Sequence, residues 1–127
     1  MRTSITEMAE LRFPKRLRLL KPVEFERVMA ARCSASDGLV RMYATANALG
    51  HPRLGLTVSR KVGGATTRNR WKRTLREAFR LVQHELPACD IVCIPQRDAT
   101  PDVRALVESL RKLGRRIDER LRRGSEP

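Results

Sequence analysis

The chain has 127 residues, which is the size of one ordinary domain with a single core. Lysine and arginine number 27 against 14 acidic residues, so the formal net charge is +13. The positive charges repel one another unless a polyanion binds to them, and this excess favours nucleic acid as the partner. Two alternatives remain from charge alone, namely an anionic membrane surface and solubilising charge with no partner.

The sequence also argues against a membrane or secreted protein. No apolar run approaches the ~20 residues that span a bilayer, and the N-terminus has no apolar segment typical of a signal peptide. Three cysteines in a cysteine-poor chain favour reduced thiols over a disulfide framework. We therefore expect a cytoplasmic protein with no membrane partner.

The first predicted helix covers about 22–32. Pro22 suits a first helical turn because its missing N–H needs no partner there. Phe25, Val28 and Met29 follow at helical spacing. An aromatic in this setting is more often core than a platform for a ligand, but periodicity cannot separate the two roles for Phe25.

Two strands are predicted next. Residues 34–38 have the composition of a loop, whereas 39–46 and 54–59 each alternate between apolar and polar positions. Because only a short loop separates the two alternating segments, we expect them to pair as a hairpin.

A long helix is predicted from a cap at Thr66 or Thr67 to about Leu86. Its apolar stripe, which includes Trp71 as a core residue, comprises Trp71, Leu75, Ala78, Phe79, Val82 and Leu86. Beside the stripe runs a row of cations at four-residue spacing, Arg68, Lys72, Arg76 and Arg80.

The C-terminal part adds a strand and a helix. The wholly apolar run 91–94 predicts a central strand covered on both faces. Thr100-Pro101-Asp102 predicts the start of a last amphipathic helix, in which Gly114 is a weak point. The order α-β-β-α-β-α predicts one α+β domain, a small sheet with helices packed against it.

The strongest functional signal is a basic cluster at the start of the long helix. Between Arg53 and Arg80 there are nine Lys or Arg and one acid, and they are densest over 68–73. A helix N-terminus favours phosphate, arginine offers bidentate donors, and the preceding Gly63 and Gly64 allow close backbone approach. The alternative is an ordinary solvated helix face.

A second candidate surface is the polar face of the strands. Gly55, Thr57 and Ser59 are small, and Arg41 and Tyr43 stand on the neighbouring segment. Such a face leaves room for an extended polymer and offers a tyrosine for stacking, as in single-stranded RNA binding. A plain solvent-facing sheet explains the pattern equally well.

No catalytic or metal site of the protein itself is predicted. The two histidines, His51 and His84, have no partner implied by spacing, and the carboxylates are scattered. His84, Cys89 and Cys93 match no common zinc pattern and lack a fourth ligand, and Cys93 fits the core of the third strand. We expect a protein that binds and does not cut.

Three motifs carry a resemblance to a known family. The segment Arg53-Leu-Gly-Leu-Thr-Val-Ser-Arg-Lys61, followed by Arg68-Asn-Arg-Trp-Lys-Arg73 and Arg76-Glu-Ala-Phe79, resembles the bacterial ribonuclease P protein family. The order of elements matches from Phe13 to about Arg123. The resemblance implies an αββαβα sandwich with a small mixed sheet and a left-handed crossover between the second and third strands. It also implies a flexible extension at 1–12, a domain at 13–123 and a tail at 124–127.

The resemblance further implies the function and its residues. The protein would be the non-catalytic subunit of an endoribonuclease that removes the 5′ leader of precursor tRNA, with the active site and the required Mg²⁺ on a catalytic RNA. Its partners would be that RNA and precursor tRNA, with no obligate protein partner. Catalytic-RNA binding falls on Arg68, Asn69, Arg70, Lys72, Arg73 and Arg76. The leader cleft falls on Phe25, Met29, Tyr43, Thr57, Ser59, Arg60 and Lys61.

Three other functions are alternatives. A ribosomal or RNA-chaperone protein would have a similar charge and a similar small α+β fold. A DNA-binding regulator would be expected to contain a helix-turn-helix, but the residues before Thr66 have the pattern of strand and loop. A protein-only nuclease would need the carboxylate cluster that the sequence lacks.

Overall fold

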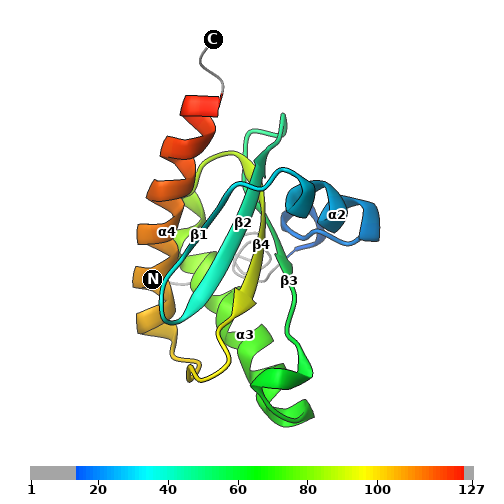
Figure 1. The fold of residues 1–127 in the computed structure, drawn as a ribbon, viewed down its shortest axis with the longest axis vertical. Coiled ribbons are helices and arrows are strands. Elements are labelled where there is room, and N and C mark those ends of the chain that lie inside the picture. The colour runs from blue at the N-terminus through cyan, green and yellow to red at the C-terminus, as the bar shows by residue number, and fades with distance from the viewer. Residues whose placement is uncertain (1–13, 125–127) are drawn as a thin grey trace, which may run out of the picture.

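The computed structural model describes residues 14–124. These residues form three α-helices and a four-stranded sheet, with short 3-10 turns (η) between them (Figure 1). In chain order the elements are η1 (Lys15–Leu17), α2 (Pro22–Ala30), β1 (Ser34–Ser36), β2 (Val40–Ala46), β3 (Arg53–Leu56), η2 (Arg60–Val62), α3 (Ala65–Val82), η3 (Gln83–Glu85), β4 (Cys89–Pro95) and α4 (Val103–Gly124). The predicted α+β class and order of helices are confirmed.

The strand order of the sheet is β1-β2-β4-β3. β4 pairs antiparallel with β2 and parallel with β3, so it separates the two strands that we expected to form a hairpin. The hairpin prediction is therefore wrong. The physical reason is the composition of β4: six of its seven residues are buried, which requires a neighbour on each edge and a layer on each face.

A short edge strand was also missed. Residues Ser34–Ser36, which we expected to form a loop, pair antiparallel with β2. Ala35 is buried while both flanking serines are half-buried, so the period of two is present, but over only three residues. The serines are typical of loops, and their role as an edge strand depends on pairing with β2.

The parallel pair β3 and β4 is joined by a crossover through α3. In Figure 1 both strands run downward, β4 lies to the left of β3, and α3 passes behind the sheet. This arrangement makes the crossover left-handed, as the family resemblance implied, against the strong general preference for right-handed ones.

Helices α3 and α4 cover one face of the sheet and form the main core with it. The predicted apolar stripe of α3 is buried, including Trp71 with no exposed surface, and Cys93 lies in the same core. On the opposite face α2 covers only part of the sheet, through a smaller cluster that includes Leu19, Val28 and Val92. The rest of that face is left open.

Two helix starts differ in how they are capped. Helix α3 begins at Ala65 with Gly64 as its N-cap, so Thr66 and Thr67 lie in the first turn and neither is the cap that we predicted. The Arg68 N–H donates to the Gly64 carbonyl at 2.9 Å, which closes the first turn without a capping side chain. At α4 the carboxylate of Asp102 accepts the Ala105 N–H at 2.9 Å, as an N-cap does.

Close packing explains why a glycine stands at position 114 within α4. A Cβ at this position would lie 2.6 Å from Cδ2 of Leu86, so the glycine lets α4 closely approach the residue that follows η3. Among residues 14–124, none of the helices is both long and apolar enough to cross a bilayer.

Candidate nucleic-acid interface

The first turns of α3 carry the predicted basic cluster. Buried Trp71 and Leu75 fix which side of the helix faces the core, so Asn69, Arg70 and Arg73 are exposed on the far side. Arg68 and Lys72 are half-buried at the flank of the core-facing stripe. The six residues assigned to catalytic-RNA binding thus form one continuous arc from the flank to the outer face of the helix.

The charges of this arc are not neutralised by the part of the chain that the structure describes. Within residues 14–124 no carboxylate lies at ion-pair distance from any of the six predicted residues. Arg80, the last member of the row, differs because it forms an ion pair with Glu77. The arc is therefore a concentration of positive charge that is suited to phosphate.

A hollow of about 210 Å³ lies between the arc and the N-terminal segment. Its cations are Arg18, Lys72 and Arg76, and its floor is apolar and includes Leu54 and Leu56. Partial burial and the charge of Arg18 lower the pKa of Arg76, because both disfavour another positive charge in this place. Arg18 was not among the predicted site residues, although the basic residues before Pro22 indicated cations in this segment.

The open sheet face adjoins this cluster. The register places Tyr43, Val92 and Gly55 side by side on three adjacent strands. Phe25 packs against this row of residues, because a Cβ at position 55 would lie 2.6 Å from the ring of Phe25. The room above Gly55 is therefore filled by Phe25, contrary to our expectation that it is open to a polymer. Phe25 is half-buried in the smaller cluster, so it is a core residue with an exposed part.

The remaining residues of the predicted cleft are exposed. Met29 on α2 retains 38% of its surface, and Thr57 follows the end of β3. Ser59 accepts the Lys61 N–H at 3.3 Å and thereby caps η2, which carries exposed Arg60 and Lys61.

The chain then turns directly into α3. Gly63 has φ = 141°, a conformation that favours glycine, and Gly64 caps the helix. The polar end of the sheet face and the basic arc are thus joined by η2 and two glycines.

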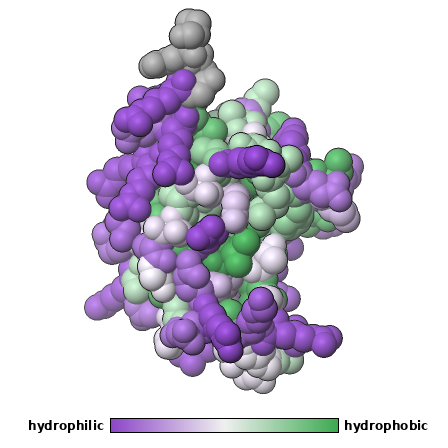
Figure 2. Space-filling model, viewed as in Figure 1, coloured by the Kyte–Doolittle hydropathy of each residue, from purple (hydrophilic) through white to green (hydrophobic). Residues whose placement is uncertain are grey.

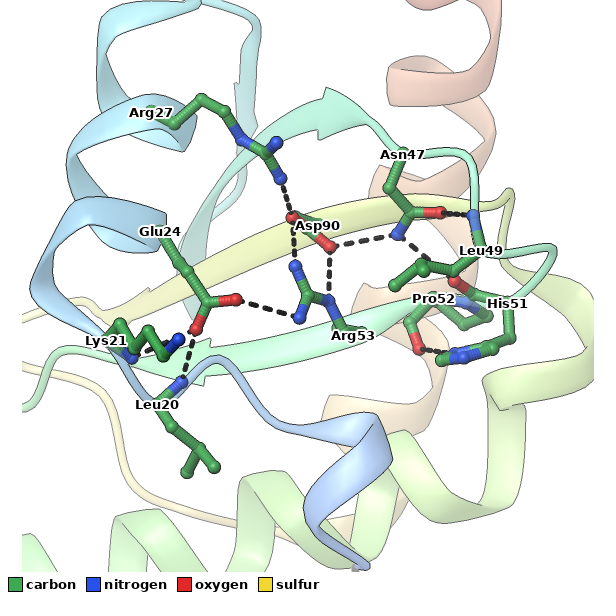
Figure 3. A network of polar contacts seen from close by, with 10 residues as sticks. All are labelled: Leu20, Lys21, Glu24, Arg27, Asn47, Leu49, His51, Pro52, Arg53 and Asp90. Atoms are coloured by element: carbon green, nitrogen blue, oxygen red, sulfur yellow. Dashed lines mark hydrogen bonds and ion pairs between the residues drawn. The ribbon is translucent and has the colours of Figure 1, made fainter.

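A buried ionic network between α2 and this face of the sheet was not predicted. Asp90 on β4 has no exposed surface and accepts two hydrogen bonds from Arg53, both at 2.8 Å. Asn47 donates to the same carboxylate at 2.9 Å, and Arg27 of α2 also donates to it (Figure 3). Arg53 further pairs with Glu24 of α2 at 2.8 Å. The network therefore ties α2, which carries Phe25 and Met29, to the sheet.

The network also controls the protonation of Asp90. Burial raises the pKa of this carboxyl, but the hydrogen bonds from Arg53 and Asn47 and the charge of Arg53 outweigh burial, so its pKa lies below the usual value. Glu24 likewise has a lowered pKa, chiefly because it accepts the backbone N–H groups of Lys21 and Leu20. Both carboxylates are engaged in holding α2 in place.

The described residues 14–124 contain no group of three or more His, Cys, Asp or Glu that could hold a metal ion. Cys89 and Cys93 are buried, and burial raises the pKa of each thiol to about 12. Neither cysteine therefore has the thiolate character of a metal ligand.

The fold and this surface define a small basic α+β protein suited to nucleic-acid binding, and comparison with known proteins identifies the family. The family model described as ribonuclease P matches residues 13–118. The ribonuclease P protein component of Escherichia coli strain K12 / DH10B is 49% identical over 120 residues, which cover 93% of this chain and all of the relative. The component from Salmonella newport matches equally well.

Solved structures agree with these sequence matches. The ribonuclease P protein of Staphylococcus aureus has a TM-score of 0.68 at 30% identity, covering 76% of this chain and 91% of that one. The Thermotoga maritima protein has a TM-score of 0.68 at 31% identity, covering 77% and 96%. The chain belongs to the ribonuclease P protein family.

Proposed function

We propose that this chain is the protein subunit of a ribonuclease P ribonucleoprotein, in which it binds both the catalytic RNA and the 5′ leader of precursor tRNA. The observation that carries the proposal is the junction between two surfaces. The unneutralised cations of α3 adjoin an open sheet face, and η2 connects them over a few residues. One bound RNA and one single strand can therefore meet at this junction.

The arc on α3 is the proposed contact with the catalytic RNA. Arginine can bind phosphate oxygens through two parallel N–H donors, and the charge has no competing carboxylate among residues 14–124. Arg70 and Arg73 point outward and reach a partner first, whereas Arg68 and Lys72 lie at the flank. Contacts of this kind position the RNA without reading its sequence.

The open sheet face is the proposed path of the leader. Tyr43 and the exposed part of Phe25 offer aromatic surface on which bases can stack, and Met29 adds a polarisable apolar contact. Arg60 and Lys61 lie at the end of this path and can neutralise leader phosphates. Precursor tRNA would gain these contacts and mature tRNA would not, so the substrate would bind more tightly than the product.

Bond cleavage is assigned to the RNA. Asp90 and Glu24 are committed to the ionic network, and the described carboxylates do not fit a metal site. In this proposal the catalytic Mg²⁺ is bound by the RNA and not by the carboxylates of residues 14–124. By neutralising phosphate charge, the protein would reduce the Mg²⁺ concentration that the RNA needs.

The test is cleavage of a precursor tRNA at low Mg²⁺ by a bacterial ribonuclease P RNA, with and without the full-length chain, beside the chain alone. We expect cleavage at the mature 5′ end only from the combination. If the chain adds nothing and instead sediments with ribosomes, a ribosomal or chaperone role replaces this proposal. Cleavage by the chain alone would move the active site to the protein.

A pair of variants tests the leader path. Phe25→Ala removes the aromatic surface, and we expect it to reduce the preference for precursor over mature tRNA by about 5- to 150-fold, the loss typical of one stacked base. Leu49→Ala removes exposed apolar surface from the β2–β3 loop and serves as the control. Equal preference in both variants and the native protein would refute the assignment of Phe25.

A further inference from the structure

Helix α4 carries a second concentration of positive charge. Between Val103 and Gly124 there are eight Lys or Arg and three acids. Each acid is engaged by an arginine of the same helix; the pairs are Glu108–Arg111, Asp118–Arg122 and Glu119–Arg123. The charges left without an acidic partner on the helix lie mainly along one side.

That side faces the edge strand β1. Lys112, Arg116 and Arg120 follow one another at four-residue spacing, with Arg115 beside them. Arg116 donates to the carbonyl oxygen of Ser36 at 3.4 Å, and Arg120 donates to that of Ser34. These bonds hold the two guanidinium groups along the edge of the sheet and leave most of their N–H donors for a partner.

The compensating charge on this side is small. Lys112 lies 3.4 Å from Asp37, a carboxylate that also accepts the Ser109 hydroxyl and two backbone N–H groups. For Arg115, Arg116 and Arg120, the part of the chain that the structure describes offers no carboxylate within ion-pair distance. The row is exposed and keeps its charge.

The surface beside α4 is hollowed at both ends of the row, next to Leu39 at one end and next to residues 31–33 at the other. One hollow of about 600 Å³ is lined by Lys112, Arg115 and Arg116 together with Glu108, whose carboxylate pairs with Arg111. The other, of about 440 Å³, lies between Arg120 and Arg32. Together with the row they define the α4–β1 groove, whose cations are Arg32, Lys112, Arg115, Arg116 and Arg120.

Apart from Arg32, which lies just after α2, the groove is far from the candidate leader path. Helices α2 and α4 lie on opposite sides of the molecule in Figure 1, and the hydrophilic side chains along α4 form a continuous column in Figure 2. A strand held under α2 therefore cannot account for the cations along α4.

We propose that the α4–β1 groove binds the phosphate backbone of a second segment of the RNA subunit, independently of its base sequence. This inference rests on the proposed function. Four residues of α-helix rise about 6 Å, which is comparable with the spacing of successive phosphates along one strand. Lys112, Arg116 and Arg120 can therefore follow a backbone phosphate by phosphate. Contacts of this type contribute affinity and orientation without base readout.

RNA fits the groove better than a membrane surface does. A helix that lies on a bilayer exposes large apolar side chains beside its cations. Among the described residues the exposed large apolar side chains are Leu20, Val23, Met29, Leu49 and Leu81, and none of them is on α4.

The test measures the salt dependence of binding to a bacterial ribonuclease P RNA by filter binding. The variant Arg115→Gln/Arg116→Gln/Arg120→Gln removes three charges from the groove. The slope of log K against log salt should become shallower by about 2 to 3, since each phosphate contact contributes about 0.7–0.9. Between 50 and 200 mM salt, the loss of affinity should be about 20- to 40-fold smaller than for the native protein.

Two control variants separate this effect from net charge and from folding. Arg111→Gln/Arg122→Gln/Arg123→Gln removes the same number of charges from the same helix, but from arginines that are already paired with acids, and should keep the native slope. Arg115→Lys/Arg116→Lys/Arg120→Lys retains the charge and should restore most of the slope. Circular dichroism of each variant confirms the fold.

The outcomes discriminate between the two proposals. If the groove variant keeps the native slope while Arg70→Gln/Arg73→Gln on α3 lowers it, the groove proposal is overturned and the proposed function stands. If the native chain does not bind the RNA, both fail. If the groove variant and the paired-arginine control lowered the slope by the same amount, net charge would explain the effect and the groove proposal would be overturned. Retention by phosphatidylglycerol vesicles that depends on the groove arginines would overturn the assignment to RNA.

Discussion

Replacing Asp90 with asparagine should destabilise the protein strongly, because this carboxylate joins four parts of the chain. It has no exposed surface, and the Arg53 side chain that binds it through two donors is only 18% exposed. Removing one partner of a buried ion pair costs about 3–5 kcal/mol. Arg53 retains Glu24 as a partner at 2.8 Å, so we expect the lower end, about 3 kcal/mol.

The effect should depend on pH in a defined direction. The pKa of Asp90 is lower in the folded chain than in the unfolded chain, so the network contributes stability above the unfolded carboxyl pKa, about 4. That contribution disappears as pH falls through the still lower folded pKa. The difference in free energy of unfolding between the native protein and Asp90→Asn should therefore be largest at pH 7 and should decrease below about pH 4.

Urea unfolding followed by circular dichroism measures both effects. Asp98→Asn, in an exposed turn, is the matched control and should leave the midpoint unchanged. A loss below about 1 kcal/mol for Asp90→Asn at pH 7 would refute the assignment, because that is the size of an exposed ion pair. A gap that stayed constant from pH 7 to pH 3 would refute the account of the pKa.

Two further changes test the packing. Gly114→Ala should change the free energy of unfolding by less than about 1 kcal/mol, because the Cδ2 methyl of Leu86 ends a flexible side chain that can move aside and the cost of that movement offsets the ~1 kcal/mol gained in helix propensity; a loss above about 2 kcal/mol in urea unfolding would contradict this. In thiol titration at pH 8, we expect the half-buried Cys33 alone to react in the folded protein. Burial holds the pKa of Cys89 and Cys93 at about 12, so both should react only after unfolding.

Features that repeat along the chain could be predicted from the sequence. The apolar stripe around Trp71 predicted α3 and its buried side, and apolar residues at the same helical spacing from Val103 onward predicted α4. The basic cluster could be placed for the same reason, since its residues alternate with the stripe on one helix. Hydrophobic periodicity determines such elements because burial acts on each helix separately.

The order of the strands could not be predicted by adjacency in the sequence. β2 and β3 are separated by a short loop, yet β4, more than thirty residues later, lies between them. The available signal was the apolar run in β4, which needs a neighbour on each edge. The same long-range pairing explains why the ionic network was not predicted, because Asp90 can contact Arg53 and Arg27 only where β4 lies between β2 and β3.

Gly55 shows how the missed contacts bear on the candidate site. The small residue was interpreted as space for a bound strand, but the ring of Phe25 fills that space. Phe25 lies on α2 between Glu24 and Arg27, and both of these join the network through Arg53 or Asp90. The aromatic surface offered to a leader is therefore held by an apolar contact on the sheet and an ionic contact beside it. A change that releases either one should move Phe25, so leader preference and stability should fall together at these positions.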